Sequence, residues 1–192
     1  MLTIADCVIN GFGRIGEWFG VERFGLEPDL IVFAKGVTSG YLPLGGVVAS
    51  PRVAEPFWGE TGHPFSHGAT YSGHPACCAA ALANIALLER DDLVHRARTL
   101  ETPFHAALRA LESHPRAGIV RGGVGLMAAV TVDPEFLTGD PDASTRLWRG
   151  AREGGLLTRW LRDGVAIAPP LIVEDEHIAE IVDVLGGAFD AV

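Results

Sequence analysis

The chain has 192 residues, enough for one domain or for a large and a small lobe. Its net charge is −9 and Lys and Arg form no run, which excludes nucleic acid as an expected partner because phosphate neutralisation needs a basic face. The longest apolar run, residues 76–88, is shorter than the roughly 20 residues of a membrane-spanning helix, so we expect no membrane association. Three cysteines make no disulfide framework, which predicts a reducing, cytoplasmic location.

Three apolar segments in the first fifty residues predict strands. They cover residues 2–9, 29–34 and 44–50. The second is a continuous apolar run bounded by Pro28 and Lys35, which is typical of a buried parallel strand. A helix is expected from Pro75, which suits a first helical turn, to about residue 90.

The second half of the chain predicts a helix, a hairpin and a closing helix. Apolar residues three or four positions apart indicate a helix over 93–111, which Pro103 should kink or split. Residues 117–132 predict two strands around a glycine-rich turn, and 165–173 a further extended segment. Apolar residues between 178 and 189 predict an amphipathic helix, and we place the boundary between the lobes near 90–95.

The stretch "VINGFGRIG" (8–16) contains the G-x-G-x-x-G pattern of dinucleotide-binding turns. Such a turn leads directly into a helix, but glycines and a proline interrupt residues 17–30. The next strand ends at Lys35 rather than at an acidic residue. The string resembles the opening of glyceraldehyde-3-phosphate dehydrogenases, yet Cys77 and Cys78 lie in an alanine-rich helical segment that favours buried structural thiols. An NAD-binding oxidoreductase is the least favoured interpretation.

Asp6 and Lys35 lie at the ends of two predicted strands. Ligands of open α/β sheets bind beyond the carboxyl ends of the strands. A lysine amine and a carboxylate together suit pyridoxal 5'-phosphate, which needs a Schiff-base lysine and an acid that keeps its pyridinium nitrogen protonated. Taken singly, Lys35 also fits a solvated charge and Asp6 a loop cap.

Four stretches together carry a family resemblance along essentially all of the chain: "IADCVINGFGRIGEWFG", "EPDLIVFAKGVTSGYLPLGG", "FSHGATYSGHPACCAAAL" and "GLLTR…IAPPLIV". The chain resembles the C-terminal portion of class III pyridoxal-phosphate aminotransferases of the ω-amino acid:pyruvate or diamine type. The resemblance implies an α/β protein of fold type I. Residues 1–92 would be the end of the large, mostly parallel α/β domain, and 93–192 the small C-terminal α+β domain. It also implies a homodimer with the active site at the interface.

The resemblance assigns roles to four residues. Asp6 resembles the aspartate at the pyridine nitrogen, and Lys35 the lysine that forms the Schiff base and shuttles the substrate proton. Thr70 resembles the threonine that reaches the cofactor phosphate of the neighbouring subunit. Arg159 resembles an arginine that binds a substrate carboxylate, with Arg162 close enough to compete for that role.

The implied activity is transfer of an amino group from an ω-amino acid, amine or amino acid to a keto acid such as pyruvate. Two alternatives stay open, namely a non-catalytic fragment or half-subunit of such an enzyme and an aminomutase of the same fold. The histidines of "HPFSH" (63–67) have a metal-ligand spacing, but Pro64 argues against a helix that presents both, so no metal site is expected.

Two departures from the family pattern concern the loop after Asp6. Cys7 replaces the usual glutamate, and Ile15 stands where threonine is commoner. The family's first half has no counterpart here, and a strand begins almost at Met1, so we expect a fragment. Unpaired strand edges then predict a chain that is poorly soluble or that binds pyridoxal phosphate weakly.

Overall fold

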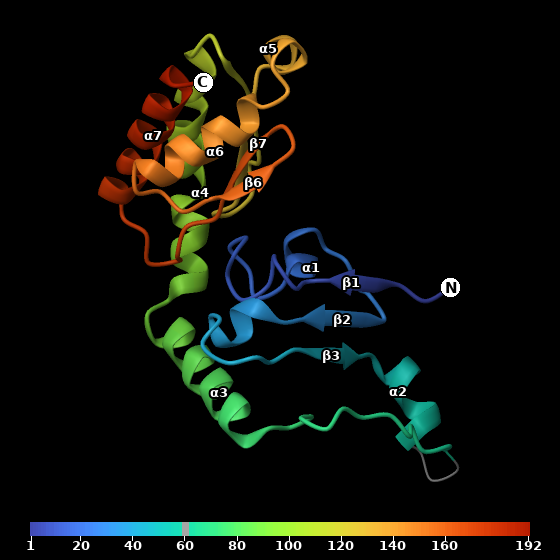
Figure 1. Ribbon diagram of the computed structural model, residues 1–192. Coiled ribbons are helices and arrows are strands. Elements are labelled where there is room, and N and C mark those ends of the chain that lie inside the picture. The colour runs from blue at the N-terminus through green and yellow to red at the C-terminus, as the bar shows by residue number, and fades with distance from the viewer. Residues whose placement is uncertain (59–61) are drawn as a thin grey trace. The chain divides into compact units, whose positions relative to one another are not determined.

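The computed structural model describes residues 1–58 and 62–192. These form two compact units, Met1–His95 and Arg96–Val192, and the boundary between them falls within the long helix α4. Figure 1 shows the first unit in blue to green and the second in green to red. Each unit has its own sheet.

The first unit is built on a sheet of three short strands in the order β1-β2-β3. Their bounds are Ile4–Asp6 for β1, Leu30–Phe33 for β2 and Gly46–Ala49 for β3. β1 and β2 run parallel, whereas β2 and β3 run antiparallel (Figure 1). All three strands lie within segments that the sequence predicts as strands, although each is shorter than the apolar run that contains it.

The helices of this unit are α1 (Gly20–Arg23), the 3₁₀ turn η1 (Lys35–Thr38), α2 (Pro51–Trp58) and α3 (Pro75–Arg90). The glycine-rich loop before α1 turns through positive φ angles at Phe12, Gly13 and Gly16. It leads to a helix of only four residues that starts at Gly20. The loop therefore lacks the long helix that a dinucleotide-binding turn needs, as its sequence predicts.

Three phenylalanines pack the glycine-rich loop against β2. Phe12 contacts Phe19 and Phe33 edge-on, with ring centroids 5.4 and 5.8 Å apart. Edge-to-face pairs at this spacing are favourable beyond the area that they bury. The loop is thus a packed part of the unit, positioned by aromatic contacts.

The second unit contains an antiparallel sheet in the order β4-β5-β7-β6. The strands are β4 (Ala117–Arg121), β5 (Ala128–Val132), β6 (Arg159–Leu161) and β7 (Gly164–Ile167). β4 and β5 form the glycine-rich hairpin that the sequence predicts. The helices are α4 (Leu93–Arg109), the 3₁₀ turn η2 (Ala110–Ser113), α5 (Pro134–Gly139), α6 (Ala143–Glu153) and α7 (Asp175–Asp190).

One hydrophobic core holds this unit together. α6 packs against α7 and against β6 and β7 (Figure 1). The largest fully buried side chains of the unit are Phe104, Phe189, Leu108, Leu126, Leu147 and Leu185. Of the kink or split expected at Pro103, the split is wrong, because α4 continues through this residue. Pro103 is exposed while the next residue is buried, so core burial outweighs the loss of one backbone hydrogen bond.

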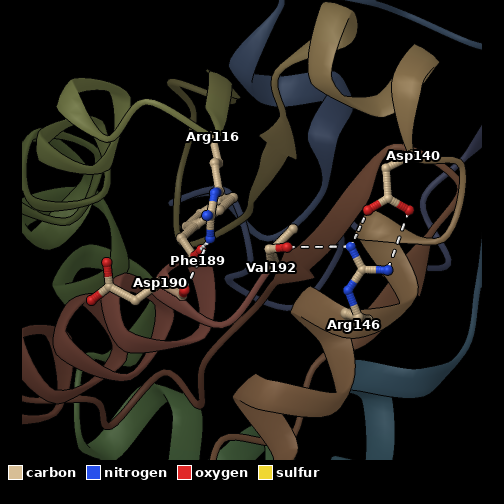
Figure 2. Close-up of polar contacts among 6 residues, drawn as sticks. All are labelled: Arg116, Asp140, Arg146, Phe189, Asp190 and Val192. Carbon is tan, nitrogen blue, oxygen red and sulfur yellow. Dashed lines mark hydrogen bonds and ion pairs between the residues drawn. The ribbon is translucent and has the colours of Figure 1, made fainter.

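Two arginines hold the end of the chain against the second unit (Figure 2). Arg116 donates from Nη1 to the carbonyl oxygens of Phe189 and Asp190, at 3.2 and 2.9 Å. A side-chain cation near the last carbonyls of a helix satisfies acceptors that have no partner within the helix.

Arg146 lies between Asp140 and the last residue of the chain (Figure 2). It is paired with both oxygens of Asp140 and donates to the Val192 carbonyl oxygen at 3.2 Å. The hydrogen bond from Arg146 lowers the pKa of the Asp140 carboxyl. Both side chains are partly exposed, so we assign this pair an orienting role rather than a large share of stability.

A buried histidine anchors the glycine-rich hairpin turn to α4. His105 is 3% exposed, and its Nε2 lies 3.1 Å from the Gly123 nitrogen and 2.9 Å from the Gly125 oxygen. A Cβ at Gly122 would lie 2.7 Å from the imidazole, so the turn needs glycine there. Glu101, also on α4, accepts a hydrogen bond from the Gly125 N–H.

This histidine predicts an acid-sensitive second unit. Desolvation by burial lowers the pKa of His105 below 6.5, against opposing contributions from the Gly125 carbonyl and Glu101. The unfolded chain then binds more protons just below pH 6.5, so the free energy of unfolding falls as pH drops through that value. Urea unfolding at pH 7.5 and 5.5, followed by circular dichroism, measures this loss. His105→Gln should reduce the difference between the two pH values, and an undiminished difference contradicts the assignment.

Candidate active site

Asp6 and Lys35 lie at the same edge of the first sheet. Asp6 is the last residue of β1 and is in register with Val32 on the parallel strand β2. Lys35 follows the end of β2 and begins η1. Because β1 and β2 are parallel neighbours, their carboxyl ends meet, and the acid and the amine come from adjacent strands.

The turn after β1 fixes the Asp6 carboxylate. Its Oδ1 accepts a hydrogen bond from the Val8 N–H at 3.0 Å, and the Asn10 side chain donates to the Asp6 carbonyl at 3.3 Å. The Asp6 side chain is exposed, whereas Cys7 beside it is 1% exposed. A carboxylate at position 7 would be buried in this chain, and Cys7 avoids that desolvation cost.

Lys35 has an unusual backbone and an accessible side chain. Its φ of 42° lies in the left-handed region, which is costly for a non-glycine residue and persists only where the surrounding structure holds it. The residue is exposed, and within residues 1–58 and 62–192 its amine makes no hydrogen bond or ion pair. It lines a cavity of about 310 Å³ together with Thr38, Gly40, Tyr41, Leu42, Pro43 and Leu44.

Lys35 is also the one lysine of the sequence, since the other fourteen basic residues of the Lys and Arg count are arginines. The composition therefore points to Lys35 independently of its position after a predicted strand. An arginine cannot form an imine with a carbonyl group, whereas a lysine amine can. Amine-directed chemistry on a side chain of this protein therefore reports on Lys35.

The glycine-rich loop packs against the turn that carries Lys35. A Cβ on Gly36 would lie 2.9 Å from the Phe12 Cβ and 3.3 Å from the Gly11 carbonyl oxygen. This close approach explains why glycine follows the lysine. The loop with the dinucleotide-like string thus covers one side of η1.

Gly36→Ala is expected to destabilise the Lys35 turn by about 1–2 kcal/mol, because overpacking displaces Phe12 or the turn itself. Urea unfolding and hydrogen exchange of residues 35–39 measure this effect. Gly25→Ala tests backbone strain alone, since its added Cβ has no neighbour within 4 Å. Equal exchange within residues 35–39 of the Gly36→Ala variant and the unmodified chain would contradict the packing argument.

Thr70 lies in a turn that precedes α3. The Ala69 N–H donates to the Ser72 hydroxyl at 3.0 Å, and the Ser72 N–H donates to the Ala69 carbonyl at 2.9 Å. The Thr70 side chain is exposed. Among the described residues no hydrogen bond joins Thr70 to Asp6 or Lys35.

Arg159 belongs to the second unit, where it begins β6 opposite Ala166 of β7. Its side chain is exposed, and it lies on a strand rather than on a helix. Arg162 follows β6 in the turn to β7 and is exposed as well. The sequence does not predict strand β6, because its three residues are too few to show a period.

His63 and His67 are not part of a possible metal site among the described residues. Across residues 1–58 and 62–192, no group of three or more His, Cys, Asp or Glu side chains could hold a metal ion. In the same part of the chain, every helix is too short or too polar to cross a membrane.

Comparison with known proteins decides the family. Residues 1–189 match the sequence model described as aminotransferase class-III. The chain belongs to this family. The putrescine–pyruvate aminotransferase of Pseudomonas aeruginosa is 38% identical in an alignment 187 positions long, and the match covers 95% of this chain and 40% of that protein. The diaminobutyrate–2-oxoglutarate transaminase of Halomonas elongata is 43% identical in an alignment 192 positions long, and the match covers 95% of this chain and 41% of that protein.

Solved structures of transaminases are similar to this chain along its whole length. The (S)-enantioselective omega-transaminase from Thermomicrobium roseum matches all of this chain and 43% of its own, with a TM-score of 0.91 and 37% identity. An amine transaminase from an uncultivated Pseudomonas species, solved in its PLP-bound form, matches all of this chain and 45% of its own, with a TM-score of 0.90 and 36% identity. The predicted family and α/β fold class are confirmed. The chain spans about two fifths of the length of the curated class III relatives that it matches.

Proposed function

We propose that this chain carries the lysine and the acid of a pyridoxal-phosphate-dependent transaminase. The observation that supports this most is the position of Lys35 and Asp6 at the ends of adjacent parallel strands. The residues fit the cofactor chemically, because Lys35 offers an accessible amine beside a cavity, with no partner among the described residues, and Asp6 a carboxylate held by its own turn.

Each residue then has a defined task. Lys35 would hold the cofactor covalently through Nζ and afterwards move the substrate proton with the same nitrogen. The Asp6 carboxylate would accept a hydrogen bond from the protonated pyridine nitrogen. When bound, pyridoxal phosphate supplies an electron sink for the substrate carbanion.

Thr70 and Arg159 complete the proposed site from elsewhere. The exposed Thr70 hydroxyl would donate to the cofactor phosphate of a neighbouring subunit in a homodimer. The exposed Arg159 guanidinium would bind a substrate carboxylate with two parallel hydrogen bonds. We assign residues 1–92 to the large cofactor-binding domain and 93–192 to the small domain.

The relatives suggest the substrate class. Their names join an amine or diamino acid donor to pyruvate or 2-oxoglutarate as acceptor. We therefore propose an amine or amino acid donor and a small keto acid acceptor. Three free cysteines, two of them buried, suit a cytoplasmic location.

The transfer itself is the test of this proposal. The chain is incubated with pyridoxal phosphate, a diamine and pyruvate, and alanine is measured. Alanine formation that depends on both donor and cofactor supports a transaminase, whereas a rearranged donor without alanine indicates an aminomutase. If a folded, cofactor-loaded protein forms neither alanine nor a rearranged donor, both the transaminase and the aminomutase are excluded.

A second candidate is a non-catalytic half-subunit that acts only with another polypeptide. The observation in its favour is apolar exposure on the outer strands of the first sheet, where Ile4, Val47 and Val48 are 65%, 58% and 51% exposed. Light scattering of the purified chain tests it. A monodisperse chain that forms alanine by itself excludes this candidate.

A further inference from the structure

We propose that Asn84 is a positioning residue for Lys35, acting through the turn η1. This inference rests on the proposed role of Lys35 as the cofactor-binding amine. Asn84 lies on α3, 48 positions after the first residue that it contacts in the turn. Nothing in the local sequence connects the two.

The side-chain amide of Asn84 binds the turn at three points. Its Nδ2 donates to the carbonyl oxygens of Gly36 and Val37, at 2.9 and 3.1 Å. Its Oδ1 accepts a hydrogen bond from the Ser39 hydroxyl at 2.7 Å. The orientation of the amide is fixed, because two carbonyl oxygens can only face the NH₂ group.

The turn needs an external hold of this kind. Lys35 begins it at a φ of 42°, and Ser39 caps it at 49°, so two non-glycine residues flank it in the left-handed region. A 3₁₀ turn has strained hydrogen bonds and little stability of its own. Such a conformation persists only where neighbours determine it, and the direction in which the lysine side chain leaves the backbone depends on it.

Asn84 is itself firmly placed. Cys77, Ala81 and Leu88 are the buried residues of α3, and with Asn84 they fall on one face of the helix at steps of three and four. Phe12 also approaches the turn, since a Cβ on Gly36 would lie 2.9 Å from its Cβ, but an apolar contact of this kind has no preferred direction. Asn84 thus adds directional bonds to a turn that Phe12 only covers.

A role of Asn84 in positioning Lys35 predicts different effects on covalent and on non-covalent cofactor binding. Pyridoxal phosphate needs the Lys35 amine for its bond to the protein, whereas pyridoxamine phosphate has no carbonyl group and binds without that bond. A residue that only positions Lys35 should affect the first affinity and not the second. A residue needed for the general fold of the unit should affect both.

The experiment compares Asn84→Ala and Asn84→Asp with the unmodified chain. Glu89→Gln, an exposed substitution on the same helix, is the control. Borohydride trapping at Lys35, titrated with pyridoxal phosphate, should show about tenfold weaker binding for Asn84→Ala. Asn84→Asp should weaken it further, because its carboxylate faces two carbonyl oxygens. Pyridoxamine phosphate affinity should stay the same in all four proteins.

Unchanged pyridoxal phosphate affinity in both Asn84 variants, or equal losses for the two cofactor forms, would overturn the inference. Absence of any Lys35 label in the unmodified chain instead contradicts the proposed function. In that case, hydrogen exchange of residues 35–39 in the absence of cofactor tests the contact between Asn84 and η1 by itself. Faster exchange in Asn84→Ala, with no change in Glu89→Gln, supports it, and unchanged exchange overturns it.

Discussion

Lys35→Arg is expected to lower the rate of alanine formation by roughly 10²–10⁴-fold, because the guanidinium keeps the charge but cannot exchange a proton with the substrate. The substitution conserves length and charge at an exposed position, so the unfolding free energy should hardly change. The measurement is kcat with saturating donor and pyruvate, with circular dichroism as the check on folding.

A matched control substitutes an arginine far from the site in sequence. Arg152→Lys places an exposed lysine on α6 of the second unit. This variant should retain full activity, and adding it to Lys35→Arg should restore none. Activity of Lys35→Arg within about threefold of the unmodified chain would contradict a role in proton transfer, which ordinarily contributes at least 10²-fold.

Asp6→Asn is expected to lower the rate of alanine formation by about 10–100-fold, the factor that corresponds to a lost charge-assisted hydrogen bond. The amide keeps the size of the side chain and can still accept the hydrogen bond from Val8 that shapes the turn. It cannot hold a proton on the pyridine nitrogen with a full negative charge. Label formation at Lys35 should persist, so the defect appears in kcat.

Asp163→Asn provides the comparison for Asp6→Asn. Asp163 pairs with Arg121 at 3.0 Å on the exposed surface of the second unit, where one charge contributes little. The rate of this variant should equal that of the unmodified chain. Equal rates in Asp6→Asn and Asp163→Asn would mean that Asp6 is only a cap of its own turn.

Much of the first unit could be predicted from the sequence. The continuous apolar run 29–34 predicts a strand and β2 forms there, but the expectation that it is buried is wrong, because all four of its residues are only half-buried. The polar residues at the ends of β1 and β2 share an edge because these strands are parallel neighbours. The rejection of a dinucleotide site also followed from local residues, because glycines and a proline exclude a long helix after Gly16.

What the sequence could not predict depends on contacts between distant segments. The link from Asn84 to the Lys35 turn spans nearly fifty positions and involves a common helical residue type. The continuity of α4 through Pro103 depends on how its neighbours are buried, which periodicity alone does not weigh. The effect of Cys7 likewise became interpretable only when its side chain proved to be buried and that of Asp6 exposed.

The most direct measurement is borohydride reduction of the chain in pyridoxal phosphate, followed by peptide mass mapping. The account predicts one phosphopyridoxyl group on the Lys35 peptide, and none when Lys35→Arg is combined with Arg152→Lys. That double variant still has a single lysine, but at another position, so it tests whether labelling requires the amine at position 35 or merely any lysine amine. A chain that stays unlabelled at Lys35, or a double variant labelled at the relocated lysine to the same extent, would contradict the account.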